Sequence, residues 1–114
     1  MVILLILIVT IQQKKTKFRQ SYKWKRLRNK LKLERMNDEI TGDPLSNGWS
    51  LHHVDLDESH YMNITNESNF MCLNRQTHEF LHWFLKHYER DPKILNRLRK
   101  ICEKHDRVNK KPSD

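Results

Sequence analysis

Cysteine is scarce in this chain of 114 residues: Cys72 and Cys102 are its two cysteines, and they lie thirty positions apart. The chain therefore has no Cys-x-x-Cys pair, the arrangement that holds structural zinc in many small metal-binding domains. Its length suits a single domain with a modest hydrophobic core. We expect the packing of apolar side chains, rather than a cysteine-bound zinc ion, to hold the fold together.

Long apolar runs are also missing, apart from one short run at the start of the chain. Residues 2–11 are apolar except for Thr10, but about 20 such residues are needed to span a bilayer. No basic residue precedes the run and no small-residue cleavage site follows it, so it makes a poor signal peptide. Three interpretations stay open: a packed hydrophobic strand, a marginal membrane-surface anchor, or an extension outside the functional domain, which we favour.

Basic residues are absent from the middle of the chain and concentrated on either side of it. Residues 36–74 contain seven acidic residues and no Lys or Arg, whereas residues 14–35 contain eleven basic residues and one acid. Residues 75–114 are again basic, and the whole chain has a formal net charge of +8. A basic run is often only solvated surface, but a strongly basic face also neutralises phosphates.

The chain does contain a spaced set of histidines. Five of its seven histidines fall within a window of 31 residues; four of the five form two pairs, and Asn69 lies between the pairs. His52 and His53 are adjacent in a short stretch that alternates apolar and polar residues, which predicts a strand with the two rings pointing different ways. His78 and His82 are four positions apart, which puts both on one face of a helix. Because histidine is both a transition-metal ligand and a base near neutral pH, the set indicates a hydrolytic metal site.

In order and spacing, these four histidines and the asparagine between them resemble the HNH (ββα-metal) endonuclease motif, in its colicin-nuclease form with a second helix histidine. The five residues from Asn69 resemble the second strand of that motif, and the four from Arg75 resemble the turn into its metal-binding helix. Upstream, the stretch from Phe18 to Arg28 resembles the basic helix that precedes many such cores. The resemblance covers roughly residues 17–90 and extends to small free-standing phage and prophage nucleases.

Apolar periodicity predicts the helices of the chain. One helix, capped by Ser21, runs to about Met36. A second covers residues 77–90, and a last helix follows Asp91-Pro92, with the aspartate as its cap and the proline at its first position. The side chains that we expect to be buried in these helices are Trp24, Leu27, Leu31, Phe80, Leu81, Trp83, Phe84, Leu85, Tyr88, Ile94, Leu95, Leu98, Ile101 and Cys102.

The resemblance implies an α+β fold, in which a two-stranded hairpin and a metal-binding helix form a small ββα-metal core with flanking helices. The second strand of the hairpin would cover residues 69–73. In domain terms, we expect an N-terminal extension over residues 1–16, an endonuclease domain over 17–107 and a flexible tail over 108–114.

The same resemblance implies metal-dependent hydrolysis of DNA phosphodiester bonds. His52, His78 and His82 would hold one divalent cation, and His53 would be the general base that takes a proton from the attacking water. Asn69 would hold the loop after the first strand in place and so orient His53. A ligand set made only of nitrogens favours zinc, nickel or manganese over magnesium, and the choice among Mg2+, Mn2+, Ni2+ and Zn2+ stays open.

The expected partner is double-stranded DNA. The candidate DNA-binding residues are Lys23, Lys25, Arg26, Arg28 and Arg75, although a simple surface charge at the start of a helix explains Arg75 equally well. We expect no obligate protein partner, no stable membrane span and a cytoplasmic location, in the host if the chain is phage-encoded. Two other functions stay open: a non-catalytic DNA-binding protein with a metal-stabilised ββα fold, and a small membrane-associated interaction protein.

Overall fold

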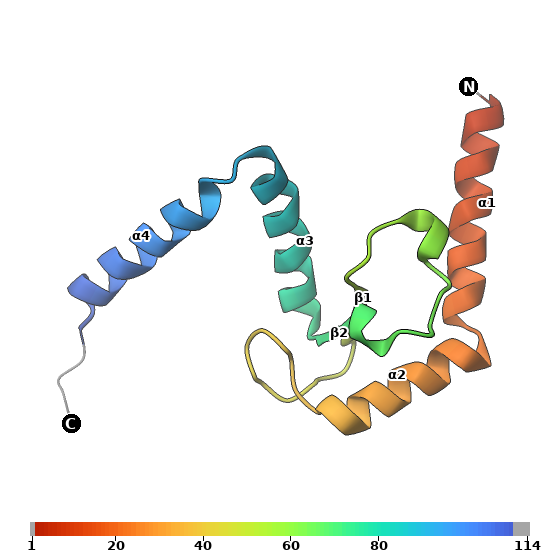
Figure 1. Ribbon diagram of the computed structural model, residues 1–114, viewed down its shortest axis with the longest axis horizontal. Coiled ribbons are helices and arrows are strands. Elements are labelled where there is room, and N and C mark those ends of the chain that lie inside the picture. The colour runs from red at the N-terminus through yellow and green to blue at the C-terminus, as the bar shows by residue number, and fades with distance from the viewer. Residues whose placement is uncertain (1, 111–114) are drawn as a thin grey trace. The chain divides into compact units, whose positions relative to one another are not determined.

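The computed structural model of the chain describes residues 2–110, and Figure 1 shows its elements in chain order. They are α1 (Val2–Arg19), α2 (Tyr22–Arg35), β1 (Ser50–His53), the 3-10 turns η1 (Glu58–His60) and η2 (Glu67–Asn69), β2 (Phe70–Leu73), α3 (Arg75–Arg90) and α4 (Ile94–Val108). Helices combined with one two-stranded antiparallel sheet make an α+β fold, so the predicted fold class is confirmed.

The chain divides into two compact units, Met1–His78 and Glu79–Asp114. The division falls inside helix α3 rather than near the ends of the chain. Of the flexible tail expected over residues 108–114, Val108 is the last residue of α4, and residues 111–114 lie outside the described part of the chain.

Helix α2 forms as its sequence predicts. The side chain of Ser21 accepts a hydrogen bond from the backbone N–H of Trp24 and so caps the first turn, a contact that typically contributes about 1 kcal/mol. Met36 ends the helix with a φ of 66°, in the left-handed region, and its N–H reaches back to the carbonyl of Lys32. The three side chains expected on the inner face are all buried: Trp24, Leu27 and Leu31.

Strands β1 and β2 form an antiparallel hairpin that pairs His52 with Met71 and His53 with Phe70. His52 and His53 lie in a strand as predicted, and β2 begins one residue after the predicted start of the second strand. A two-stranded sheet alone is marginal in water, and here residues next to α2 satisfy the outer edge of β2. The backbone N–H of Glu39 donates to the carbonyl of Cys72 at 3.0 Å, and the carboxylate of Glu39 accepts from the N–H of Cys72.

The hydrophobic core lies between α2 and the hairpin. It consists of seven buried residues, Trp24, Leu27, Leu31, Trp49, Leu51, Phe70 and Cys72, with Phe18, Leu45 and Ile64 packed against them. Burial of each large apolar side chain contributes about 1.5–3 kcal/mol. No Cys-x-x-Cys pair exists in the sequence, and this cluster, together with hydrogen bonds from α2, attaches the hairpin to the helix.

Helix α1 contains the apolar run at the start of the chain, so the interpretation of this run as a packed strand is wrong. A strand needs a neighbour for its N–H and C=O groups, whereas a helix pairs them internally. The second half of α1 contacts the loop between β1 and β2. Lys15 Nζ lies 4.8 Å from the ring centre of Tyr61, Arg19 donates a hydrogen bond to the Tyr61 hydroxyl, and Phe18 packs beside Trp24. Among the described residues, no helix combines the length and the apolar character that crossing a membrane requires.

Helix α3 begins at Arg75, two residues before its predicted start, and its apolar face is not buried as predicted. Phe80 is 51% exposed and Trp83 is 48% exposed, and α3 has no buried residue. The aromatic side chains instead stack along the helix itself, with Phe84 between Phe80 and Tyr88. Residues three and four apart meet on a helix surface, so this stacking needs no covering element. Six side chains of α3 were therefore wrongly predicted to be buried: Phe80, Leu81, Trp83, Phe84, Leu85 and Tyr88.

Helix α4 also differs from its prediction. It begins at Ile94, and Asp91-Pro92 forms a turn before the helix rather than its cap and first position. The Asp91 carboxylate accepts a hydrogen bond from the N–H of Lys93 and pairs with Arg97. None of the side chains predicted to face inward is buried: Ile94, Leu95, Leu98, Ile101 and Cys102.

Candidate metal centre

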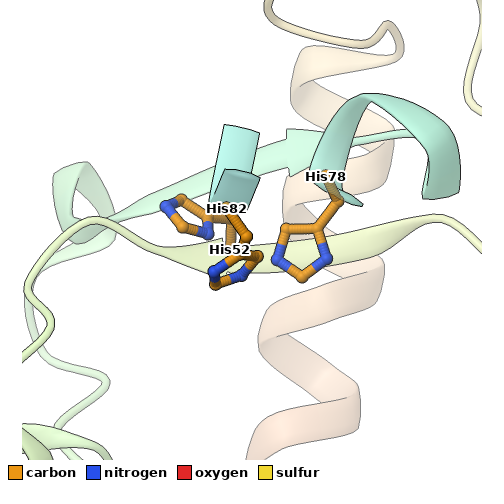
Figure 2. A group of neighbouring side chains, drawn as sticks. All are labelled: His52, His78 and His82. Atoms are coloured by element: carbon orange, nitrogen blue, oxygen red, sulfur yellow. The ribbon is translucent and has the colours of Figure 1, made fainter. Parts of the chain in front are cut away.

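Three of the histidines singled out by the sequence come together in the structure. Figure 2 shows His52, from strand β1, beside His78 and His82, which lie one turn apart on helix α3. One ring nitrogen of each histidine lies within 4.8 Å of the others. The rings of His52 and His78 are 5.2 Å apart between centroids, at an interplanar angle of 68°. Because all three donors are imidazole nitrogens, the group has the chemistry of a transition-metal site.

The spacing of the three nitrogens suits one ion. Zinc binds histidine nitrogen at about 2.0–2.1 Å, which puts tetrahedral ligands roughly 3.3 Å from each other. The observed separation of up to 4.8 Å is therefore wider than in a loaded site, by an amount that small rotations of the rings can close. Three ligands would leave a fourth position for water or substrate, as catalytic zinc sites do.

Burial distinguishes His52 from the two helix histidines. His52 is 3% exposed, whereas His82 lies on the exposed side of α3. Strand β1 is covered on both faces, because Leu51 belongs to the hydrophobic core and the next residue, His52, meets the ring of His78. The ring of His52 beside that of His78 places two imidazole donors from different elements close together.

The buried carboxylate of Asp38 holds the start of helix α3 against the loop that follows α2. Its oxygens accept hydrogen bonds from the backbone N–H groups of Ile40, Thr41 and Asn74, at 2.8, 2.9 and 2.8 Å. Burial alone would raise the pKa of Asp38, but these bonds and one from the Thr77 side chain outweigh it and lower the pKa to about 2. Sequence reasoning missed Asp38, because its partner Asn74 lies 36 positions away.

Asn74 is the second residue that positions α3. Its side-chain oxygen accepts from the N–H of Ser46 at 2.8 Å, and its amide nitrogen donates to the carbonyl of Pro44 at 3.1 Å. Its backbone carbonyl accepts the N–H of His78 at 2.9 Å. The turn that begins α3 is thus tied to the loop before β1, which fixes the backbone of one metal-ligand candidate.

His53 does not join the three-histidine group. Its ring stacks with the rings of Trp24 and Tyr61, at centroid distances of 5.5 and 4.3 Å and nearly parallel to both. Its Nε2 lies 3.0 Å from the carbonyl oxygen of Tyr61. A carbonyl only accepts, so Nε2 carries the hydrogen and Nδ1 keeps its lone pair. Burial, the largest influence, lowers the pKa of His53 and so favours the neutral ring.

Asn69 closes the hairpin through its main chain. Its backbone carbonyl accepts the N–H of Val54 at 2.7 Å, directly after His53. This main-chain bond links Asn69 to the residue that follows the first strand, and any residue at this position could make it. An orienting role of the Asn69 side chain toward His53 stays a prediction.

The candidate DNA-binding residues differ in their surroundings. Lys23, Lys25 and Arg26 are exposed on α2. Arg28 instead stacks on the Trp49 ring at 4.0 Å and donates to the Trp49 carbonyl at 2.7 Å, and burial lowers its pKa. Arg28 thus helps to attach β1 to α2.

Hydrogen bonds between its own residues stabilise a turn in the acidic loop that joins the two strands. The Asp55 carboxylate lies 2.8 Å from Nδ1 of His60 and also accepts the N–H of Asp57. The hydrogen bond to Asp55 raises the pKa of His60. In the part of the chain that the structure describes, Asp55, Asp57 and His60 form a separate exposed cluster and do not belong to the three-histidine group.

Comparison of the chain with protein-family models, with curated proteins and with solved structures finds no match in any of the three. The function must therefore be argued from the side chains and their geometry.

Proposed function

We propose that the chain is a metal-dependent HNH endonuclease that hydrolyses phosphodiester bonds of double-stranded DNA. One observation carries the proposal: ring nitrogens of His52, His78 and His82 lie within 4.8 Å of one another, in the order and spacing of the HNH motif that the sequence resembles. Two histidines at helix spacing often only decorate a surface. A third, buried, and supplied by a strand 26 positions upstream, makes a ligand set.

The positions of the four histidines suggest a separate role for the metal ligands and for the general base. His52, His78 and His82 would hold one divalent cation, which when bound supplies Lewis-acid polarisation of the scissile phosphate. His53 would accept a proton from the attacking water at Nδ1, because its Nε2–H is used by the Tyr61 carbonyl. The water oxygen forms the new bond to phosphorus, the bond to the 3′-oxygen breaks, and solvent supplies the proton of that leaving oxygen.

Two aromatic side chains would keep the proposed base in one orientation. The rings of Trp24 and Tyr61 each stack with the ring of His53, at interplanar angles of 7° and 16°. A base whose ring plane and tautomer are already fixed loses little freedom during the proton transfer.

The proposal that DNA is the substrate rests on the positive charge of the chain. Residues 14–35 contain eleven Lys and Arg residues, of which Lys23, Lys25 and Arg26 are exposed on α2. Arg75, exposed at the first position of α3, is a further candidate contact to phosphate. Such residues release counterions from DNA when they bind. A DNA substrate also favours a cytoplasmic location.

Incubation of the purified protein with supercoiled plasmid and Mg2+, Mn2+, Ni2+ or Zn2+ tests the proposal. We expect nicked or linear plasmid with at least one metal, and no product after chelation. His78→Ala and His82→Ala should each lose this activity, whereas His105→Ala, which alters a histidine of α4 outside the group, should keep it. Calorimetric metal binding without cleavage under any of the four metals would contradict catalysis.

A non-catalytic DNA-binding protein is the second candidate, and the position of His53 favours it. The ring of His53 packs with Trp24 and Tyr61, and the metal-ligand group does not include it. In that case the three histidines would hold a structural ion, and removing the ion would unfold the hairpin. Circular dichroism with and without chelator separates the two candidates, because a catalytic ion can leave a folded protein.

A further inference from the structure

The first half of helix α1 exposes apolar side chains in every direction around its axis. Five consecutive residues, Ile3 to Leu7, are 54% to 84% exposed. Successive residues of an α-helix are about 100° apart, so five in a row go completely around it. A protein groove covers one face of a helix, whereas hydrocarbon covers all of them.

Helix α3 provides the contrast within the same chain. Its exposed aromatic residues Phe80 and Trp83 are three positions apart, and they therefore share one side of the helix. A one-sided stripe of this kind suits another helix as its partner. The apolar half of α1 has no polar side to keep in water.

The polar groups of this half of α1 are suited to hydrocarbon as well. Residues 2–13 contain no charged side chain, and the hydroxyl of Thr10 donates to the carbonyl of Ile6 at 2.9 Å. At a rise of 1.5 Å per residue, the ten residues 2–11 measure about 15 Å, which is half of the roughly 30 Å hydrocarbon core of a bilayer. This length reaches through one leaflet, in keeping with the lack of a membrane-crossing helix among the described residues.

Positive charge begins directly where the apolar half ends. Lys14 and Lys17 are exposed on α1, and Arg19 follows within the same helix. Lysine near a membrane surface is attracted to anionic headgroups within a Debye length. An apolar segment next to such a basic segment matches the two layers of an anionic leaflet, acyl chains and headgroup phosphates.

We propose that α1 docks the protein onto an anionic lipid leaflet, with the side chains of Ile3 to Leu7 among the acyl chains and Lys14 and Lys17 against headgroup phosphates. The proposal does not depend on nuclease activity.

Contacts of the second half of α1 would keep the docked helix attached to the core. Phe18 lies 5.4 Å from Trp24 and 5.9 Å from Tyr61 between ring centroids, and Lys15 pairs with Glu58. Membrane docking would therefore hold the hairpin and the proposed base close to the lipid surface rather than on a loose tether.

Flotation of the full chain with vesicles tests the proposal. Vesicles of phosphatidylcholine with 30% phosphatidylglycerol should carry the protein upward, and pure phosphatidylcholine should carry much less. Replacing both Leu5 and Ile6 by Asp should weaken binding at least about a hundredfold, because two apolar side chains lose their burial. Replacing Lys14 and Lys17 by Gln should weaken it about 20–30-fold on anionic vesicles, since each charge contributes roughly fivefold.

Leu33→Asp is the matched control, because Leu33 is also an exposed leucine but lies on α2. It should float like the parent, and circular dichroism should show every variant folded. A parent protein that stays at the bottom with anionic vesicles would overturn the proposal, and so would equal flotation of the Leu5→Asp/Ile6→Asp variant. A dimer that forms without lipid and is abolished by these two substitutions, again with no flotation, would identify a second copy as the partner instead.

Discussion

The ring of His53 stacks on the ring of Tyr61 at 4.3 Å, and its Nε2 lies 3.0 Å from the carbonyl oxygen of the same tyrosine. One residue thus sets both the ring plane and the tautomer of the other. Tyr61 is in turn held by Arg19, which donates to its hydroxyl at 3.0 Å. A helix outside the ββα unit therefore supports the histidine that we propose as the base.

His53→Ala and His78→Ala should fail in different ways. His53→Ala should lower the cleavage rate about 10²–10⁴-fold, the usual effect of losing a general base, and leave metal affinity close to the parental value. His78→Ala should lower metal affinity by more than the 10–100-fold that losing an outer-shell partner costs, and high metal should restore part of its activity. Calorimetry and plasmid nicking on the same variants measure both. Parental cleavage by His53→Ala would show that the base is elsewhere.

Local signals in the sequence were enough to predict α2 and the hairpin. Ser21 is a cap that acts within one turn, and the alternation around His52 and His53 is a short-range pattern. The apolar run before Ile11 gave no such signal, because a segment that is apolar throughout has the periodicity of neither helix nor strand. In the described part of the chain β1 and β2 pair with each other, whereas a helix pairs the backbone groups of this run internally.

The candidate metal ligands could be predicted from the sequence, but the hydrogen bonds that position helix α3 could not. Spacing placed His78 and His82 on one helix face, and the motif order added His52. The carboxylate of Asp38 could not be found this way, because its contact with Asn74 exists only in the folded chain. Burial in α3 was wrongly predicted for a related reason: an apolar stripe shows which face avoids water, and not whether another element covers it.

The exposed basic residues of α2 should set the salt dependence of DNA binding. Replacing Lys23, Lys25 and Arg26 by Gln should weaken duplex binding uniformly across sequences, and should reduce the slope of log affinity against log salt by up to about 3. Arg28 is left intact because it supports Trp49. Fluorescence anisotropy at several salt concentrations measures the slope. The control removes three charges of α4, by replacing Lys100, Lys104 and Arg107. An equal fall in both variants would show that α2 is not the DNA-binding surface.

Asp38 should make stability depend on pH in the acid range. Its pKa is about 2 in the folded chain and 3.8 ordinarily, so the folded state favours the carboxylate. The resulting stabilisation, about 2 kcal/mol, is fully present above pH 4 and is lost as the pH falls toward 2. Asp38→Asn should lower the free energy of unfolding by about this amount at pH 6 and weaken its pH dependence below 4. Urea unfolding at several pH values measures this.

The matched control for that experiment is Asp106→Asn, because Asp106 is an exposed aspartate on α4. It should unfold at the parental urea concentration at pH 6. If Asp38→Asn keeps the acid dependence of the parent, other carboxylates cause it, and the hydrogen bonds at the start of α3 contribute less than their number suggests.

Deleting residues 1–12 should leave metal-dependent cleavage and the folded hairpin intact. The deletion removes exposed apolar residues of α1 and keeps Lys15 and Phe18, which contact the loop and the core. Lipid flotation should be lost in the same protein, so one deletion separates the two proposed properties. Plasmid nicking and circular dichroism provide the measurements. Loss of the folded hairpin would mean that the apolar half of α1 belongs to the core.

The folded protein should bind one divalent ion, and that ion should depend on the three histidines. The chain has no Cys-x-x-Cys pair, and the described residues contain one group of His, Cys, Asp and Glu side chains with ligand spacing. Elemental analysis after dialysis should find at most one equivalent of metal in the parent and none after His78→Ala and His82→Ala are combined. Cys72→Ser with Cys102→Ser is the control, and it should keep the ion because neither thiol lies in the group. Zinc that survives removal of both helix histidines would require a second site and would contradict the single metal centre proposed for this chain.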